Sequence, residues 1–291
     1  MKNRQLYVAD WGRRAIRRLC LAGFAALAAL PALAGEATVE AVQWPAWVVR
    51  DGRQIPVQAG ADLQARDRLL TGRNARLLIR LSDGSAVKVG EQADVVLAAA
   101  DRKEDALQAA IEVGKGAFRF TTGLFAKVLG KREVKVRVST LTIGIRGTDV
   151  WGKSTEVDDL VLLLEGKVSV SQDAGPEQEL ATPLEYLLAP RGRSAERKSA
   201  PAAQVGEWAK ETEIDAKRPA GRAGGRHAAS IAEVETEAEA LKLRSALLEE
   251  GYPVRLRPLD GGRYALRLER IGSAKEAAAL AAEARSKLKS P

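Results

Sequence analysis

Short hydrophobic segments separated by glycine-bearing turns run through the first two-thirds of the chain. Residues 134–138 (VKVRV) alternate apolar and basic side chains, and this period of two predicts a strand with one buried face. Segments 77–81 and 86–90 flank Asp83-Gly84, a residue pair that favours a tight hairpin turn. Strands joined by such turns predict an all-β region.

Further segments of strand length extend this pattern to residue 190. Residues 107–113 and 117–120 flank Gly114-Lys-Gly116, which we interpret as another turn. Residues 160–164 are continuously apolar, which predicts a strand buried on both faces. Residues 186–189 are expected to close the domain. Many short strands predict a sandwich, a barrel or a solenoid, and we find no clean repeat period that establishes a regular β-helix.

The last sixty residues follow a different pattern, with helical spacing on either side of two strands. Helices are predicted over 238–250 and 275–288, and strands over 254–257 and 264–268. Gly251 is placed to end the first helix, and Ser273 with Glu276 has capping-box spacing before the second. With a first strand at 228–234, this order predicts a split βαβ arrangement.

Residues 191–228 between these regions are rich in Arg, Gly, Ala, Ser and Pro, a composition typical of a flexible linker. Residues 205–214 could form a short helix, with Trp208 docking back on the β region. The arginines of this segment are interpreted as solvated, with contact to an anionic polymer as the alternative.

The charge of the chain is concentrated near its start. Of the formal net charge of +8, residues 1–34 contribute most, since they hold six basic residues and one acidic residue. An apolar run over 19–30, Pro31 and a small-x-small pattern at 32–34 predict a secretory signal peptide, cleaved after Ala34. We therefore expect a periplasmic protein with no transmembrane span after cleavage, or a membrane-anchored one if the signal is retained.

Few residues are suited to metal or nucleophilic chemistry. Cys20, in the signal segment, is the sole cysteine, and His227 is the sole histidine. We expect no disulfide, no metal site and no cofactor. Asp158 and Asp159 are adjacent on a predicted strand and would point to opposite faces, so they do not form a catalytic pair. We expect no enzymatic activity, and a glycan hydrolase with two carboxylates is the remaining catalytic alternative.

The stretch TIGIRGTDV at 142–150 invites comparison with a phosphate-binding loop. Its glycines are too closely spaced for a P-loop, and a strand follows instead of a helix. Two glycines around an arginine suit a tight corner between strands, in which Arg146 would pair with Asp149 or another carboxylate. The residues assigned a structural role in this corner are Gly144, Arg146, Gly147, Thr148 and Asp149, and ligand contact by Arg146 and Thr148 is the alternative.

Four arginines alternate with apolar residues on the two C-terminal strands. The strand pattern places Tyr264, Leu266 and Leu268 toward the helices, and the arginines on the other face of the sheet. Planar guanidinium groups there could contact glycan hydroxyls and carboxylates, or they could form an ordinary solvated face. RNA is a weaker candidate because recognition would need stacking aromatic residues on that face. The candidate contact residues are Arg255, Arg257, Arg263, Arg267 and Tyr252.

The β region resembles the FecR domain of bacterial envelope regulators. The matching segments are Gly60-x-x-Leu63, Asp67-x-x-x-x-Thr-Gly72, Arg80-Leu-x-Asp-Gly-Ser85, Ile111-x-x-Gly114, Thr142-x-Gly-Ile-Arg-Gly-Thr-Asp149 and Leu164-Glu-Gly-x-Val168. They span about residues 38–190. The resemblance implies a β domain that binds a ligand or an envelope protein.

The C-terminal region resembles a SPOR domain, a small ferredoxin-like βαββαβ module that binds peptidoglycan glycan strands stripped of stem peptides. The matching segments are Glu237-Ala-Glu-Ala-Leu241, Leu247-x-x-x-Gly-Tyr-Pro-Val254, Gly262-x-Tyr264-x-Leu-x-Leu268 and Ser273-x-x-Glu-Ala277. The first strand at 229–234 and the segment 269–272 depart from the usual motifs of that family.

Together these patterns predict a signal peptide (1–34), a FecR-like β domain (35–190), a linker (191–228) and a SPOR-like domain (229–291). The expected function is that of an exported cell-envelope binding protein held on denuded glycan strands, with an unidentified envelope protein as a second partner and no nucleic acid. The alternatives are a regulator or scaffold whose SPOR-like module binds protein, and a wall-active hydrolase.

Overall fold

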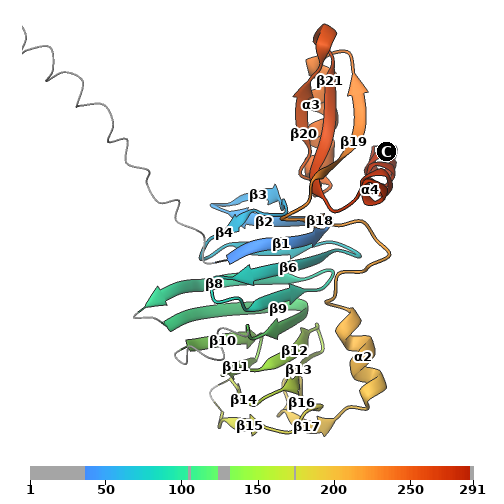
Figure 1. Ribbon diagram of the computed structural model, residues 1–291. Helices are drawn as coiled ribbons and strands as arrows, with labels where there is room; N and C mark the ends of the chain where they lie inside the picture. Colours follow the sequence, from blue (N-terminus) through green and yellow to red (C-terminus); the bar gives the residue numbers. More distant parts are fainter. Residues whose placement is uncertain (1–36, 104–105, 124–131, 174, 289–291) are drawn as a thin grey trace, which may run out of the picture. The chain divides into compact units, whose positions relative to one another are not determined.

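The computed structural model describes residues 37–103, 106–123, 132–173 and 175–288, all within one compact unit, Gly35–Pro291 (Figure 1). The predicted signal segment and Cys20 lie outside these residues. Within the described part of the chain, no helix has the length and apolar character needed to cross a membrane.

Within the described residues, the strands of the β region form two sheets that share one long strand. The first sheet has the order β4 (Asp62–Leu63), β1 (Ala37–Gln43), β6 (Arg76–Leu81), β7 (Ala86–Val89), β9 (Ala106–Thr121), β12 (Asp149–Ser154), β13 (Asp158–Glu165), β16 (Glu185–Pro190) and β17 (Glu196–Ser199). The second has the order β3 (Arg53–Pro56), β2 (Ala46–Arg50), β5 (Arg68–Thr71), β8 (Asp94–Lys103), β9, β10 (Arg132–Val138), β11 (Leu141–Ile145), β14 (Val168–Gln172) and β15 (Gln178–Leu180).

The chain moves back and forth between the two sheets as it advances along them. Neighbouring strands are antiparallel, except for the parallel pair β9 and β10. Phe118 and Leu163 from the first sheet share one hydrophobic core with Ile111 and Val136 from the second. The predicted all-β fold is therefore present. It consists of two stacked sheets, and successive segments of the chain add strands to one sheet and then to the other.

The predicted turn at Gly114-Lys-Gly116 is wrong, because β9 continues through it. The first half of β9 pairs with β8 and β10 in the second sheet, and its second half pairs with β7 and β12 in the first sheet. Gly116 adopts a φ of +91°, and a Cβ there would lie 2.5 Å from the Cβ of Ala93. The glycine allows the strand to bend from one sheet into the other, where a hairpin would have reversed it.

Other elements of the β region agree with the sequence pattern. Val134, Val136 and Val138 are buried. The hairpin β6–β7 turns at Gly84, which has a φ of +80°. In β13, Val161 and Leu163 face the core between the sheets, while Leu162 packs on the outer face of the first sheet. This strand is covered on both sides, as its continuous apolar sequence predicts.

The segment predicted to be a flexible linker forms ordered elements. Strand β17 pairs with β16, so the predicted boundary at residue 190 falls inside the first sheet. Helix α2 (Ala202–Lys210) follows and lies beside β12 and β13 (Figure 1), and Trp208 docks on the β region as predicted. Strand β18 (Gly221–Arg222) then pairs with β1 and with β21. The composition of this segment predicted flexibility. A few of its apolar side chains, among them Val205 and Trp208, pack on the β region.

The C-terminal module has the predicted order of strand, helix, two strands and helix. Its elements are β19 (His227–Val234), α3 (Glu237–Glu249), β20 (Arg255–Pro258), the short 3₁₀ helix η1 (Asp260–Gly262), β21 (Tyr264–Ile271) and α4 (Ala274–Lys287). Strand β21 lies between β19 and β20 and is antiparallel to both. Ser273 caps α4 by accepting from the Glu276 amide, and Gly251 follows α3 with a φ of +82°. Both predicted helix boundaries are therefore confirmed.

Candidate functional site

The TIGIRGTDV stretch forms the corner between β11 and β12. Gly147 has a φ of +74°, a conformation that favours glycine. The amide of Thr148, which is buried, donates to Oγ1 of Thr122 at 3.0 Å. A Cβ on Gly144 would lie 2.6 Å from the Oγ of Ser169 in the neighbouring strand β14. Close packing at Gly144 and the positive φ at Gly147 account for the two glycines of this corner.

The pairing predicted between Arg146 and Asp149 is not formed. Asp149 instead receives two hydrogen bonds from Arg119 of β9, at 2.9 and 2.7 Å, while Arg146 is exposed. Arg119 also contacts Glu213, which pairs with Lys88 at 2.6 Å. Hydrogen bonding to Asp149 raises the pKa of Arg119 above its ordinary value despite partial burial. Asp149 therefore links the corner to strand β9 through Arg119. Arg119 in turn contacts Glu213, in the segment after α2.

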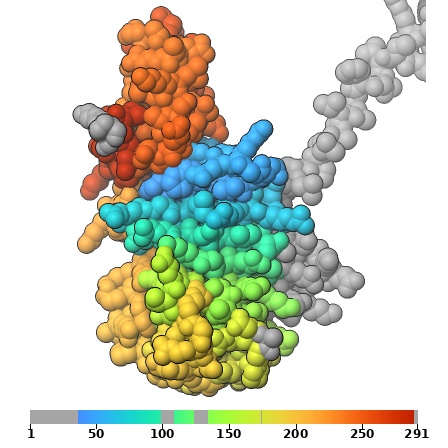
Figure 2. All heavy atoms as spheres, turned by 180° about the vertical axis from the view of Figure 1, so that it is seen from behind, coloured from blue at the N-terminus to red at the C-terminus, as the bar shows by residue number. Residues whose placement is uncertain are grey.

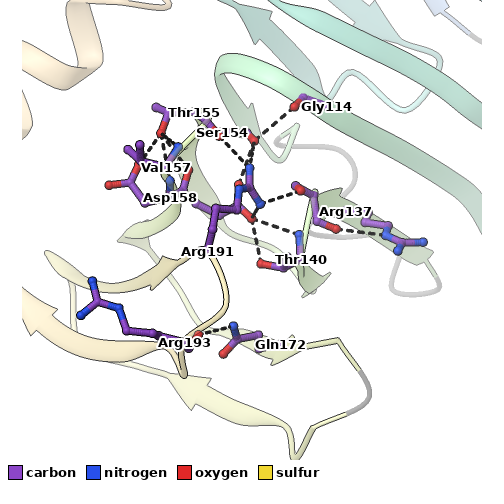
Figure 3. A network of polar contacts seen from close by, with 12 residues as sticks. Gly114, Arg137, Thr140, Ser154, Thr155, Val157, Asp158, Gln172, Arg191 and Arg193 are labelled. Atoms are coloured by element: carbon purple, nitrogen blue, oxygen red, sulfur yellow. Dashed lines mark hydrogen bonds and ion pairs between the residues drawn. The ribbon is translucent and has the colours of Figure 1, made fainter.

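The two adjacent aspartates at the start of β13 have different hydrogen-bond partners, and Figure 3 shows Asp158 beside Thr155. Asp159 has no exposed surface and accepts from Thr140, Ser154 and Arg191. Asp158 accepts from the Thr155 hydroxyl at 2.6 Å in the turn before the strand. The two carboxylates therefore make separate contacts, as expected for adjacent residues on a strand.

The open face of the C-terminal sheet carries the candidate arginines. Arg255 is the register partner of Arg267, and Arg257 is the partner of Ala265. Leu266 and Leu268 are fully buried, and the helices contact β19, β20 and β21. Since side chains alternate along a strand, Arg267 and Glu269 lie on the opposite face from these leucines. The predicted division of the sheet into an apolar and a basic face is therefore present for these residues.

Two glutamates that the sequence-based prediction missed organise the arginines. Glu269 accepts from Arg257 at 2.6 Å and lies 3.4 Å from Arg255, and the bond from Arg257 lowers the pKa of Glu269. Glu233 of β19 lies 3.6 Å from Arg263. The alternation that placed Arg267 also places Glu269, two residues later, on the same face. Four arginines and two glutamates leave this face with a net positive charge.

Arg255 and Arg267 have further distinguishing features. The Nη2 of Arg255 donates to the side-chain oxygen of Gln58 at 3.0 Å, a contact with the β region. The Nε of Arg267 is buried and has no hydrogen-bond partner among the described residues. A buried donor of this kind gains free energy when an acceptor reaches it. The face thus has paired arginines at its rim and an unsatisfied donor between them.

Tyr252 does not lie on this face, and its predicted contact role is wrong. It is fully buried, and its hydroxyl donates to Glu283 of α4 at 2.8 Å. Burial raises the pKa of Tyr252 well above its ordinary range. The reason is the position of Tyr252 directly after Gly251, where the chain turns inward at the end of α3, so the ring fills the core of the module.

Residues that could hold a metal ion do not cluster within the described part of the chain. His227 is exposed at the start of β19 and lines a shallow groove of about 300 Å³ between β19 and α4, together with Ala277 and Arg285. Arg285 donates to the backbone carbonyls of Ser230 and Ile231 there. This arrangement covers the free edge of β19.

Residues 67–169 match the family model described as FecR protein. No curated protein matches the chain. Two crystal structures of a "putative anti-sigma factor" from Parabacteroides distasonis, at 1.65 and 2.50 Å resolution, are similar to it. Their identities are 14% and 13%, they cover 67% of this chain and 95% and 96% of the other, and both TM-scores are 0.40. The family match confirms the FecR resemblance over residues 67–169, from just before β5 into β14, and the SPOR resemblance stays a prediction.

Proposed function

We propose that this chain is an exported cell-envelope binding protein whose C-terminal module binds the glycan strands of peptidoglycan. The observation that carries the proposal is the basic open face of β20 and β21, where Arg255, Arg257 and Arg267 lie on adjacent strands. The resemblance of residues 229–289 to a SPOR domain agrees with this assignment.

The chemistry of the face suits a carboxylate-bearing sugar polymer. Guanidinium groups offer planar pairs of donors to carboxylates and hydroxyls. Glu269 holds Arg255 and Arg257 in place and offers acceptor oxygens to sugar hydroxyls. Removal of the stem peptides frees the lactyl carboxylates, which are amide-bonded in intact peptidoglycan. A stripped glycan strand would therefore offer both carboxylates and hydroxyls to this face.

The β region supplies the second activity in this proposal, which is contact with an envelope protein or ligand. The match to the FecR family over residues 67–169 supports a role in envelope regulation. Weak binding of the module to the wall would raise the local concentration of the β region near its partner. The protein would then act by localisation, without catalysis.

Substitution on the face tests the glycan assignment directly. The double variant Arg255→Ala/Arg257→Ala of the full mature chain should lose at least about tenfold in affinity for peptidoglycan sacculi, since two charged contacts are removed. Lys242→Ala is the matched control, because Lys242 is an exposed cation on α3. Unchanged sedimentation of the double variant with sacculi would contradict the proposal.

The same variants address the alternative in which the module binds protein. In that case, the chain would capture an envelope protein through the module, and the double variant would lose this protein while its sedimentation with sacculi stayed unchanged. Loss of turbidity of a sacculus suspension on adding the purified chain would instead indicate a hydrolase.

A further inference from the structure

An apolar patch on the outer face of the first sheet lies beneath α2. Its buried residues are Ala117, Trp151 and Leu162 from the sheet, with Ala200 and Val205 from the covering segment. Leu160, Leu164, Leu184 and Tyr186 pack around them. Without its cover, this face would present aromatic and aliphatic side chains to water. In the space-filling view the gold atoms of α2 lie directly against the strands (Figure 2).

Helix α2 holds this patch through very few side chains. Val205 is its one buried residue among those described. Trp208 stacks on Trp151, with ring centroids 5.6 Å apart and planes within 5°, and meets the edge of Tyr186 at 5.7 Å. Gly206 lies in the middle of the nine-residue helix, and Pro201 at its start provides no side-chain cap. A short helix with an internal glycine is weak by itself, so its order depends on Val205 and Trp208.

The chain is fixed on both sides of α2 by contacts that do not involve the helix. Before it, the amide of Ala200 donates to the carbonyl of Leu184 at 3.0 Å. After it, the buried side chain of Gln43 accepts from the amide of Asp215 and donates to the carbonyls of Asp215 and Arg218. These contacts involve no residue of α2, so departure of the helix from the patch would not break them directly.

The rim of the patch is basic. Lys153 pairs with Glu211 at 2.8 Å, and Lys88 and Arg119 pair with Glu213. The indole N–H of Trp151 is buried and has no acceptor among the described residues. The surface therefore selects an occupant with an aliphatic residue, an aromatic residue three positions later and carboxylates after that.

We propose that this patch is a docking site for an amphipathic helix of a partner protein, and that α2 is a displaceable occupant that closes the site in the free chain. The partner helix would place an aromatic ring against Trp151 and acidic residues against Lys153, Lys88 and Arg119. Such a helix-in-groove contact uses the same i, i+3 anchors that α2 uses. Because α2 competes for the patch, the apparent affinity of the partner equals its intrinsic affinity multiplied by the fraction of chains in which the patch is open. This proposal does not depend on glycan binding.

A labelled peptide of residues 201–213 serves as the probe for the open patch. It should bind the full mature chain weakly, and should bind the Val205→Ala/Trp208→Ala chain roughly tenfold more tightly, because the resident helix no longer competes. The same peptide with Trp208→Ala should bind neither chain. Equal or weaker binding of the original peptide to the double variant, in a sample that unfolds cooperatively, would overturn the proposal.

Hydrogen exchange on the unmodified chain gives an independent test that needs no variant. The amides of α2 should exchange through local opening, at least about a hundredfold faster than those of β12 and β13 beneath it. If α2 exchanges at the same rate as these strands, the helix opens only with the whole domain, and it is then a fixed part of the fold.

Discussion

Arg191 lies 2.6 Å from the carboxylate of Asp159, a side chain with no exposed surface, while the guanidinium keeps about a third of its own. Arg191 also donates to Ser139, to Ser154 and to the backbone carbonyl of Thr155 (Figure 3). One guanidinium thus satisfies groups at the ends of β10, β12 and β13. The pair shows that residues just beyond the predicted domain boundary stabilise the β region.

Asp159→Asn should destabilise the chain by about 3 kcal/mol, because it leaves the Arg191 charge without its buried partner. Urea denaturation followed by circular dichroism measures this change. Asp158→Asn is the matched control, with an expected loss of about 0.5 kcal/mol, since that side chain bonds within a surface turn. Equal losses for the two variants would contradict the assigned roles.

Two residues of the TIGIRGTDV stretch should respond differently to substitution. Asp149→Asn removes a charged partner of Arg119 in a nearly buried site, and we expect a loss of about 2 kcal/mol. Arg146→Ala should change the free energy of unfolding by less than about 0.5 kcal/mol, because Arg146 is exposed. A large fall in the free energy of unfolding for Arg146→Ala would contradict this, because it would show that Arg146 has a structural partner.

Tyr252 should make stability depend on pH in alkaline solution. Because burial raises its pKa in the folded chain above the ordinary value of 10.0, its contribution is complete below pH 10 and is lost as the pH rises further. Tyr252→Phe removes this dependence, and it also removes the bond to Glu283, worth about 1 kcal/mol. Thermal unfolding at pH 8 and pH 10.5 measures both effects. An unchanged pH dependence in Tyr252→Phe would contradict the burial argument.

Much of the fold was predictable from short-range patterns. The alternation at 134–138, the hairpin at Gly84 and the capping pair Ser273–Glu276 act over a few residues, so the sequence displays them directly. The crossing of β9 at Gly116 was not predictable, because a glycine that reverses a chain and one that bends a strand look alike in sequence. Which of them forms depends on the strands that pair with each half of β9.

The candidate site was partly predictable for a similar reason. Alternation placed Arg255, Arg257 and Arg267 on one face. It gave no warning that Tyr252 turns inward, since this depends on how α3 ends and on the position of Glu283 in a distant helix. The Arg119–Asp149 pair joins strands thirty residues apart. Local spacing in the TIGIRGTDV stretch instead suggested Arg146 as the partner.

Co-sedimentation of residues 35–291 with peptidoglycan sacculi, before and after amidase removes the stem peptides, tests whether the C-terminal module binds glycan. If the arginine face binds glycan, sedimentation should increase on stripped sacculi and fall in Arg255→Ala/Arg257→Ala, with Lys242→Ala unchanged. Absence of the chain from both pellets would contradict glycan binding by the C-terminal module.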